Sequence, residues 1–412
     1  MSASRHDLNH FDLSFDLKTP ISALLPRLEA IDTAVMLTHL PRLYARLRHL
    51  DAVFGSRVQH SIAIKSQPQI ELLKVICEQG FGLEAASIEE VRRALTAGCP
   101  PHRLVFDSPV KTRRELNEVS QLQGLLVNVN SLHELSRIPS NTQCTIGIRI
   151  NPQINTGSPE LFSVGRNESK FGVPLSAHQE IMQAVLTHPV RALHMHSGSQ
   201  MRDLKAQREA LKRLGLFAHQ LNHALNRAGI DRRIEMIDIG GGLPTEPLKE
   251  QSNMKAYAAL VYEVEELREF KLITEFGQWV NAECGLALSQ IEYVVSGDPD
   301  KIFIHLGADM FTRDAYTQAR SFPLSLWGAE GDLIKGEEAV YDIAGPLCFA
   351  GDYLAKSVKL AVAKEGQWLC IDHTGANTYA LWSRHCSRDI PASWAWDGEK
   401  LINWSPRRAI EY

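Results

Sequence analysis

The feature that most constrains the fold of this chain is a regular alternation of short β-branched runs and amphipathic helical patterns between about residues 58 and 285. Eight such runs occur, each followed by a helical pattern or a loop, and eight is the strand number of a (β/α)8 TIM-type barrel. We therefore predict an α/β fold with such a barrel, and the alternative is a doubly wound open sheet. The predicted strands are 60–66, 83–86, 103–108, 125–130, 145–150, 192–198, 235–240 and 272–276.

The helical patterns are identified by the period of their apolar residues. In 254–270, the side chains of Tyr257, Leu260, Val261 and Leu267 fall with Val264 on one stripe, which is the spacing of a helix that faces a core. The other clear helical patterns are 68–79, 88–97 and 203–228.

After residue 286 the pattern changes to strand-like runs separated by turn residues, with little helical period. The run 31–37 has the same character and could join this second sheet. We predict a barrel domain over 38–285 and a β-rich domain built from 1–37 plus 286–412. The later strand-like runs are 290–295, 302–306, 339–344, 357–363 and 367–372.

Composition excludes several other classes of protein. The chain has 44 Lys and Arg against 48 Asp and Glu, so it lacks the basic surplus of a nucleic-acid-binding protein. It has no apolar run of membrane-spanning length, and its first residues do not resemble a secretion signal. The seven cysteines are scattered without a CxxC pair, which favours reduced thiols and argues against a disulfide framework or a zinc ribbon. We expect a cytoplasmic enzyme.

Candidate chemistry lies at the ends of the predicted strands, where barrel enzymes carry their active sites. Lys65 ends the first strand after an apolar run, a setting that lowers the pKa of a lysine and suits imine chemistry. His196 and Ser199 end the sixth strand. His194 and His196 could indicate a metal, but no further ligand has suitable spacing, and we expect none.

The seventh and eighth strands end in residues that suit a phosphorylated, cationic ligand. Gly240, Gly241 and Gly242 leave room for backbone N–H groups to approach a phosphate. Glu275 would lie inside the barrel mouth, where a carboxylate needs a cationic partner such as a pyridinium nitrogen. Each signal is weak alone, but their order along the strands is informative.

These motifs resemble those of the fold-type III pyridoxal-phosphate decarboxylases, which include the diaminopimelate, ornithine and arginine decarboxylases. The resemblance covers roughly residues 30–390. The segments that carry it are Ile62–Lys65, Glu84–Ser87 with Glu90, Arg149–Pro152, Ser169–Gly172, His196–Ser199, Gly240–Gly242, Glu275, and Gly345–Cys348 with Asp352.

The resemblance implies pyridoxal 5'-phosphate as cofactor and a role for each matched residue. Lys65 would form the internal aldimine, His196 would stack on the pyridoxal ring, and Glu275 would pair with the ring nitrogen. Ser199 and the three glycines would contact the phosphate. Cys348 would reach across a homodimer interface into the partner's site and return a proton to the carbanion, or quinonoid, that follows loss of CO2.

The sequence departs from the family pattern around the phosphate. A proline and an arginine that usually follow the eighth-strand glutamate are replaced by Phe276 and Gln278, with Gly277 between them. The usual tyrosine of a glycine-alanine-tyrosine motif is replaced by Asn377, and Tyr379 follows two residues later. We expect Gly277, Gln278, Asn377 and Tyr379 to bind the cofactor.

A third departure concerns the substrate. In the decarboxylases of diamines and diamino acids, the residue after the cysteine is acidic and meets the distal ammonium; here it is Phe349. A buried ammonium without an anion is costly, so we expect a simple diamino acid only if Asp352 or Glu84 takes over that role. Arg149 is predicted as a further substrate contact.

We therefore predict a pyridoxal-phosphate-dependent decarboxylase of an amino acid or amino-acid conjugate. One alternative is a racemase on the same barrel, for which Tyr341, Tyr353 or Tyr379 could supply the second base. The other is a non-catalytic homologue that binds a protein partner, which Gln278 and Asn377 would permit. Intact Lys65 and Cys348 favour the decarboxylase.

Overall fold

A computed structural model describes residues 15–409 except 247–249, 251 and 318–320. Contacts between residues divide the described chain into two compact units. One contains the described residues from Leu47 to Ala282 except Glu250, and the other contains Glu250 and the described residues before Leu47 and from Glu283 onward. The predicted limits of the barrel domain are residues 38 and 285. The observed first boundary, between Arg46 and Leu47, falls within helix α2 (Leu40–Phe54).

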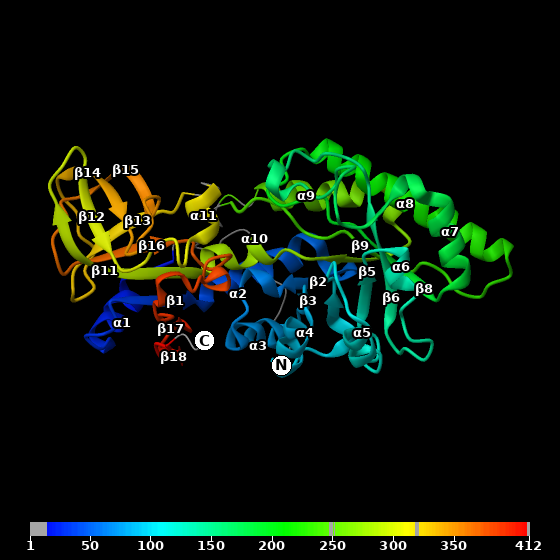
Figure 1. The fold of residues 1–412 in the computed structure, drawn as a ribbon, viewed down its shortest axis with the longest axis horizontal. Helices are drawn as coiled ribbons and strands as arrows, with labels where there is room; N and C mark the ends of the chain where they lie inside the picture. The colour runs from blue at the N-terminus through cyan, green and yellow to red at the C-terminus, as the bar shows by residue number, and fades with distance from the viewer. Residues whose placement is uncertain (1–14, 247–249, 251, 318–320, 410–412) are drawn as a thin grey trace. The chain divides into compact units, whose positions relative to one another are not determined.

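The first unit is a closed barrel of eight parallel strands, because β5 pairs with β4 on one side and with β6 on the other (Figure 1). This confirms the predicted TIM-type barrel, and the open-sheet alternative is wrong. A two-residue strand, β7 (Val173–Pro174), adds to β6 outside the closed ring. The barrel strands are β2 (Val58–Ala63), β3 (Gly82–Ala85), β4 (Leu104–Phe106), β5 (Leu126–Val129), β6 (Thr145–Asn151), β8 (Val190–His194), β9 (Met236–Asp238) and β10 (Lys271–Thr274).

Helices follow most of the barrel strands. The predicted helix over 254–270 is too long: α9 ends at Glu263, Val264 is extended, and Leu267 lies on a separate 3-10 turn. The predicted apolar stripe is nevertheless buried throughout. The other helices of this unit are α3 (Ile70–Glu78), α4 (Ile88–Thr96), α5 (Arg113–Val119), α6 (Leu132–Leu135), α7 (His178–Thr187), α8 (Leu204–Arg227) and α10 (Gly277–Asn281).

Local capping explains one of the family-like motifs. The Ser87 hydroxyl accepts a hydrogen bond from Glu90 N (3.2 Å), and Glu90 Oε2 accepts one from Ala86 N (2.7 Å). These contacts begin α4 directly after β3, because they satisfy N–H groups that the first helical turn leaves unpaired. Glu90 therefore positions the end of β3, which carries Glu84.

The second unit is mostly β, as predicted. Strand β1 pairs antiparallel with β11 and parallel with β17, which confirms that the early run 31–37 joins this sheet. The sequence did not predict β13, β17 or β18. The strands are β1 (Ala34–His39), β11 (Gly285–Val295), β12 (Asp300–Ile304), β13 (Leu324–Trp327), β14 (Glu338–Ala344), β15 (Tyr353–Ala361), β16 (Trp368–Asp372), β17 (Ala392–Trp396) and β18 (Leu401–Ser405), with helices α1 (Lys18–Leu24) and α11 (Thr312–Thr317).

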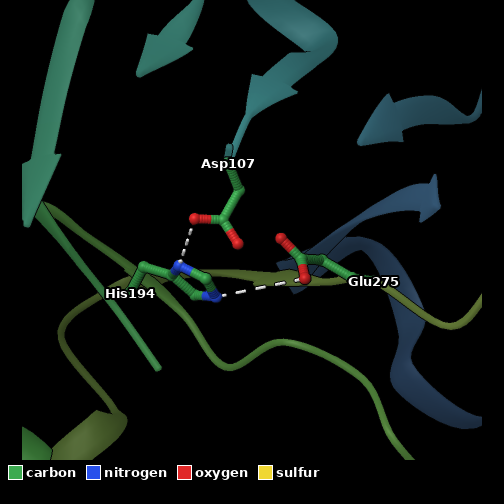
Figure 2. A group of neighbouring side chains, drawn as sticks. All are labelled: Asp107, His194 and Glu275. Atoms are coloured by element: carbon green, nitrogen blue, oxygen red, sulfur yellow. Dashed lines mark ion pairs between the residues drawn. The ribbon is translucent and has the colours of Figure 1, made fainter. Parts of the chain in front are cut away.

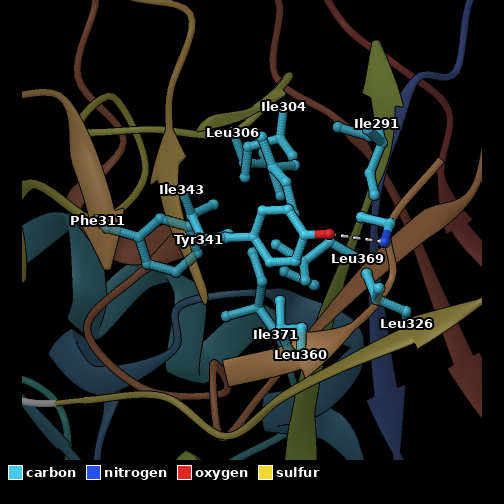
Figure 3. Packing of buried hydrophobic residues seen from close by; sticks show 14 of the residues in the cluster. Ile291, Ile304, Leu306, Phe311, Leu326, Tyr341, Ile343, Leu360, Leu369 and Ile371 are labelled. Carbon is cyan, nitrogen blue, oxygen red and sulfur yellow. Dashed lines mark hydrogen bonds between the residues drawn. The ribbon is translucent and has the colours of Figure 1, made fainter. Parts of the chain in front are cut away.

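The core of this unit surrounds Tyr341, whose ring is buried among aliphatic side chains (Figure 3). Its hydroxyl accepts a hydrogen bond from Ala363 N at 3.1 Å, so the polar tip is satisfied inside the core. Tyr341 is thereby a packing residue and not an accessible base. Within the described part of the chain, no helix has the length and apolar character needed to cross a membrane.

Candidate active site

The carboxyl-terminal ends of the barrel strands are lined with polar side chains, and every one of the eight strands contributes at least one. In a closed parallel barrel these ends converge on one mouth, which is where barrel enzymes place their chemistry. In strand order the residues are Lys65, Glu84, Asp107, Asn128, Arg149, His194, Asp238 and Glu275.

Seven of the eight barrel strands end earlier than predicted, and β6 ends one residue later. Lys65 lies on a 3-10 turn (Ile64–Ser66) after β2, and β8 ends at His194, so His196 lies two residues beyond the strand. Glu275 directly follows β10. The short turns give these side chains positions at the rim of the mouth, whereas His194 and Asp238 are the last residues of their strands.

Lys65 forms an ion pair with Glu84. Its Nζ lies 2.6 Å from Glu84 Oε2, and the lysine side chain is about half exposed while Glu84 is fully buried. Partial burial by itself would lower the pKa of Lys65, but the carboxylates of Glu84 and Glu275 outweigh it and raise the pKa above its usual value. The expected depression of the Lys65 pKa is therefore wrong for the protein without a bound ligand.

A buried cluster joins Asp107, His194 and Glu275, three residues that follow or end strands β4, β8 and β10 (Figure 2). His194 Nδ1 lies 3.2 Å from Asp107 Oδ1, and its Nε2 lies 4.0 Å from Glu275 Oε2. One nitrogen or oxygen atom from each of the three residues lies within 4.8 Å of the others. The two ring nitrogens of His194 face opposite ways, one toward each carboxylate, so the imidazole links the two acids.

Arg149 extends this cluster. Its Nη1 lies 3.0 Å from Asp107 Oδ2, and its guanidinium carbon lies 4.5 Å from the centre of the Phe171 ring. Burial would raise the pKa of Asp107, but Arg149 and His194 together hold it well below its ordinary value. Arg149 is thus engaged by Asp107, and its predicted contact with substrate stays a prediction.

The pKa of Glu275 is shifted in the opposite direction from that of Asp107. Burial raises the pKa of its carboxyl well above the usual value, and the nearby carboxylates of Asp238, Glu84 and Asp107 add to the effect. Its Oε1 is buried and has no hydrogen-bond partner among the described residues. A buried carboxyl of this kind is poised for a cationic or N–H-bearing ligand.

His196 has the properties of a neutral ring. Its Nδ1 accepts a hydrogen bond from Gly241 N at 3.2 Å. Burial, Arg149 and Lys65 lower its pKa well below the ordinary value, so the imidazole is uncharged and can stack on a flat ligand.

The glycine triplet is required by close backbone approach. A Cβ on Gly242, whose φ is +104°, would lie 2.0 Å from Gly198 O. Gly240 N donates to Asp238 Oδ1 (3.0 Å) and Gly241 N donates to His196, so among the described residues Gly242 N is the one amide of the triplet without a protein acceptor. The triplet orients its neighbours as well as leaving room for a ligand.

The remaining barrel residues predicted to bind the cofactor lie nearby in the chain. Gln278 is half-buried on the short helix α10, which begins at Gly277 directly after the Glu275 segment. Ser199 is half-buried and its N–H donates to Phe162 O at 3.1 Å. Their contacts with a phosphate stay predictions.

The other predicted site residues belong to the β-rich unit. Cys348 is exposed and Phe349 is half-buried. Asp352 is buried, and its carboxylate accepts hydrogen bonds from Ala308 N (2.6 Å) and Leu347 N (2.7 Å), so it holds its own loop together. Asp352 therefore has little capacity left for a substrate ammonium.

Asn377 and Tyr379 are close in sequence but differ in environment. Asn377 is buried with φ +58°, a conformation that asparagine tolerates better than tyrosine. Tyr379 lies on a 3-10 turn, and its hydroxyl accepts a hydrogen bond from Arg408 Nη2. The replacement of the family's tyrosine by Asn377 is compatible with the backbone at that position.

Sequence reasoning missed three residues of the mouth: Asp107, Asn128 and Asp238. Each is a polar side chain at or directly after the end of an otherwise apolar strand, and that signal was available.

The barrel mouth fits pyridoxal 5'-phosphate on two observations. The unpartnered Oε1 of Glu275 provides an acceptor for a ring N–H, and the crowded Gly240–Gly242 backbone admits no side chain where a phosphate would approach. Lys65 supplies an amine at the same rim, and the neutral His196 supplies a flat ring. Together these are the parts of a cofactor enzyme built on a barrel.

Comparison with known proteins agrees with this class. The pyridoxal binding domain of the pyridoxal-dependent decarboxylases matches residues 40–282. The chain is 28% identical to the diaminopimelate decarboxylase of Haemophilus influenzae over 363 residues, which cover 85% of each protein. It is also 28% identical to that of Pseudomonas aeruginosa over 376 residues, or 88% of this chain and 87% of the relative.

Solved structures share the fold. A diaminopimelate decarboxylase from Helicobacter pylori complexed with L-lysine aligns with a TM-score of 0.82 at 24% identity, covering 94% of this chain and 96% of that one. An arginine decarboxylase of Paramecium bursaria Chlorella virus aligns with a TM-score of 0.76 at 17% identity, covering 92% and 100%. The chain belongs to the fold-type III pyridoxal-phosphate-dependent decarboxylases, which are carboxy-lyases.

Proposed function

We propose that this decarboxylase releases CO2 from an amino acid or amino-acid conjugate whose distal end carries no free ammonium. The observation that carries the proposal is Phe349, which occupies the position where the resemblance expects an acidic residue. An apolar wall there favours an apolar, aromatic or acylated side chain, because an ammonium loses its hydration without gaining an anion.

Phe349 forms part of a small aromatic surface. Its ring stacks on Tyr316 of α11 with the ring centres 5.2 Å apart and an angle of 26° between the planes. A Cβ on Gly351 would lie 2.6 Å from Phe349 Cζ, so the glycine allows the loop to fold over the ring. Tyr316 is about two-thirds exposed, which leaves its ring available to a ligand.

Of the two acidic residues that could replace the missing anion, Asp352 already accepts hydrogen bonds from two backbone N–H groups. Glu84 Oε2 pairs with Lys65, whereas Glu84 Oε1 is buried without a hydrogen-bond partner among the described residues. Recruiting Asp352 would leave its present partners unsatisfied, at a cost of about 1–3 kcal/mol for each group.

The roles that we propose for the chain's own residues follow from their chemistry. When bound, pyridoxal phosphate supplies the electron sink for loss of the carboxylate. Lys65 Nζ is the proposed point of covalent attachment, Glu275 the partner of the ring nitrogen, and His196 the ring that stacks on it. Cys348 is the proposed proton donor to the substrate's α-carbon. The proposed phosphate contacts are Ser199, Gly240, Gly241, Gly242, Gly277, Gln278, Asn377 and Tyr379.

We also propose that the enzyme is a cytoplasmic homodimer with shared active sites. The resemblance implies that Cys348 acts in the partner's site, and its exposure leaves the thiol available for that role. Sedimentation of the purified protein would test the dimer, and a mixture of Lys65→Ala and Cys348→Ala chains should recover part of the activity that each variant loses alone.

A second candidate substrate is diaminopimelate. It is favoured by the names of the curated relatives, and an aromatic face such as that of Tyr316 can hold a cation for roughly 0.5–2 kcal/mol. Diaminopimelate carries a free distal ammonium, which Phe349 argues against. The two candidate substrates therefore predict opposite results in the same assay.

The test is CO2 release from meso-diaminopimelate, ornithine and lysine, each compared with its derivative acylated on the distal amine. We expect the acylated forms to have the higher kcat/KM, by roughly tenfold or more. A faster reaction with free diaminopimelate than with its acylated derivative would contradict the proposal and support the second candidate.

Two variants of Phe349 sharpen this test. Phe349→Asp should lower kcat/KM for an apolar or acylated substrate by on the order of 30- to 1,000-fold, equivalent to about 2–4 kcal/mol. The same variant should raise kcat/KM for ornithine or lysine. Phe349→Leu is the matched control, because it shortens the wall without adding charge. Equal losses in both variants, or an unfolded Phe349→Asp protein, would assign Phe349 to packing.

A further inference from the structure

The imidazole of His194 lies between two carboxylates and is fully buried. Nδ1 faces Asp107 at 3.2 Å and Nε2 faces Glu275 at 4.0 Å, and neither nitrogen has a hydrogen-bond partner among the described residues. A neutral ring would present a lone pair to one of these oxygens, whereas an imidazolium presents an N–H to both. Asp107, whose pKa is lowered, takes an N–H from Nδ1, and a second N–H on Nε2, which makes the ring an imidazolium, matches Glu275 in its anionic form.

The charged groups around His194 also favour its imidazolium form. The acidic groups around it in the barrel mouth are Glu84, Asp107, Asp238 and Glu275, and the cations are Lys65 and Arg149. His196 is a neutral ring, and Lys111, which also acts on Asp107, is paired with Glu134. Four buried carboxyl groups thus meet two cations, and burial raises the pKa of three of them, Glu84, Asp238 and Glu275, so a further positive charge here would favour their anionic forms. An imidazolium would supply a third positive charge, and a protonated ring nitrogen of a ligand would supply a fourth.

We propose that His194 is a positioning residue: held between Asp107 and Glu275, it carries the positive charge that keeps Glu275 available as an anion for the cofactor's ring nitrogen. The inference rests on the proposed role of Glu275. Asp107 anchors the imidazole from the other side, and Arg149 in turn fixes Asp107 through the 3.0 Å ion pair.

The proposal can be tested on the full-length protein before the cofactor is added. Glu275 titrates and its glutamine variant does not, so the difference in thermal stability between wild type and Glu275→Gln, followed over pH, reports the Glu275 pKa by linkage. Adding His194→Gln to both proteins should move that pKa upward by about one unit, a tenfold change in the proton affinity of Glu275.

His60→Gln is the matched control. His60 is also buried in the barrel, on β2, and its Nδ1 contacts Thr274 Oγ1 at 2.6 Å, but among the described residues it forms no ion pair with a carboxylate. The His60→Gln substitution should leave the pKa of Glu275 unchanged. The same upward shift in both histidine variants, or no shift in His194→Gln, would overturn the proposal, and His194→Asn provides a second neutral variant if the glutamine does not fold.

A second readout uses pyridoxal phosphate labelled with ¹⁵N at the ring. In His194→Gln the ring-nitrogen resonance should move toward the unprotonated value, and in His60→Gln it should match wild type. An unchanged resonance in His194→Gln would also overturn the proposal. Failure of the wild type to bind pyridoxal phosphate would count against the proposed site, whereas the pH titration without cofactor would still decide the role of His194.

Discussion

Two buried carboxyl groups, one in each unit of the molecule, show how differently this chain treats the same functional group. Asp352 in the β-rich unit is 4% exposed and accepts two backbone hydrogen bonds of 2.6 and 2.7 Å. Glu275 in the barrel is 6% exposed, has an oxygen without a partner, and lies among other carboxyl groups that raise its pKa.

We propose that the difference separates a structural acid, Asp352, from a functional one, Glu275. Backbone N–H groups that already donate to both oxygens of a carboxylate leave it little capacity for a ligand, so its contribution is to the stability of the loop. A buried carboxyl group without donors destabilises the protein until a ligand arrives, and proteins tolerate such groups mainly at functional sites. Both residues were candidate site residues on sequence grounds, and only their surroundings distinguish them.

The largest expected effect lies on the barrel side of this comparison. Glu275→Gln should lower kcat for CO2 release by on the order of 10²–10³-fold, because a neutral amide does not stabilise the positive charge on the cofactor's ring nitrogen. Steady-state kinetics with saturating cofactor would measure it. Nearly unchanged kcat would show that the unpartnered carboxyl is not functional and would remove the distinction from Asp352.

The matched substitution in the β-rich unit, Asp352→Ala, should lower the free energy of unfolding. Asp352→Ala leaves two buried N–H groups without an acceptor, so we expect a loss of about 1–3 kcal/mol in the free energy of unfolding for each. Denaturant unfolding of the variant beside wild type is the measurement. If Asp352→Ala kept full stability and lost only substrate affinity, Asp352 would belong with the functional acids.

The comparison also predicts opposite signs for stability in the absence of cofactor. The raised pKa of Glu275 means that the folded protein holds a proton that the unfolded chain releases, so its stability falls as pH rises above about 4.3, the unfolded value. Glu275→Gln should therefore melt at a higher temperature than wild type near pH 7, because glutamine has no proton to release; each tenfold change in the proton affinity of Glu275 corresponds to about 1.4 kcal/mol in the free energy of unfolding. The gap should close toward pH 4, and a lower melting temperature at pH 7 would contradict this.

The smallest expected effect concerns the aromatic surface beside Asp352. Tyr316→Ala removes the stacking partner of Phe349, and an aromatic pair is worth about 0.5–1.5 kcal/mol beyond its buried area. We expect KM to rise by about 2- to 10-fold with kcat little changed. A change in kcat with KM constant would place Tyr316 nearer the reacting atoms than the proposed substrate tail.

The sequence alone determined the order of parts along this chain. The β-branched runs and the period of the helices follow from local side-chain preferences, so eight barrel strands and the early strand of the β-rich unit were predictable. Lys65, His196, Gly240–Gly242 and Glu275 stood out because each follows a strand in an order that resembles one family, and their individual roles stay predictions.

Only the tertiary structure decided which of these polar groups meet and which are already satisfied. Asp107, His194 and Glu275 come from strands far apart in the sequence, and they converge because the barrel closes through the β5–β6 pairing. Asp352 finds its donor Ala308 44 residues away. The physical reason is that local propensity sets where strands begin and end, whereas the charge state and hydrogen bonding of a buried group depend on neighbours that closure and register bring together.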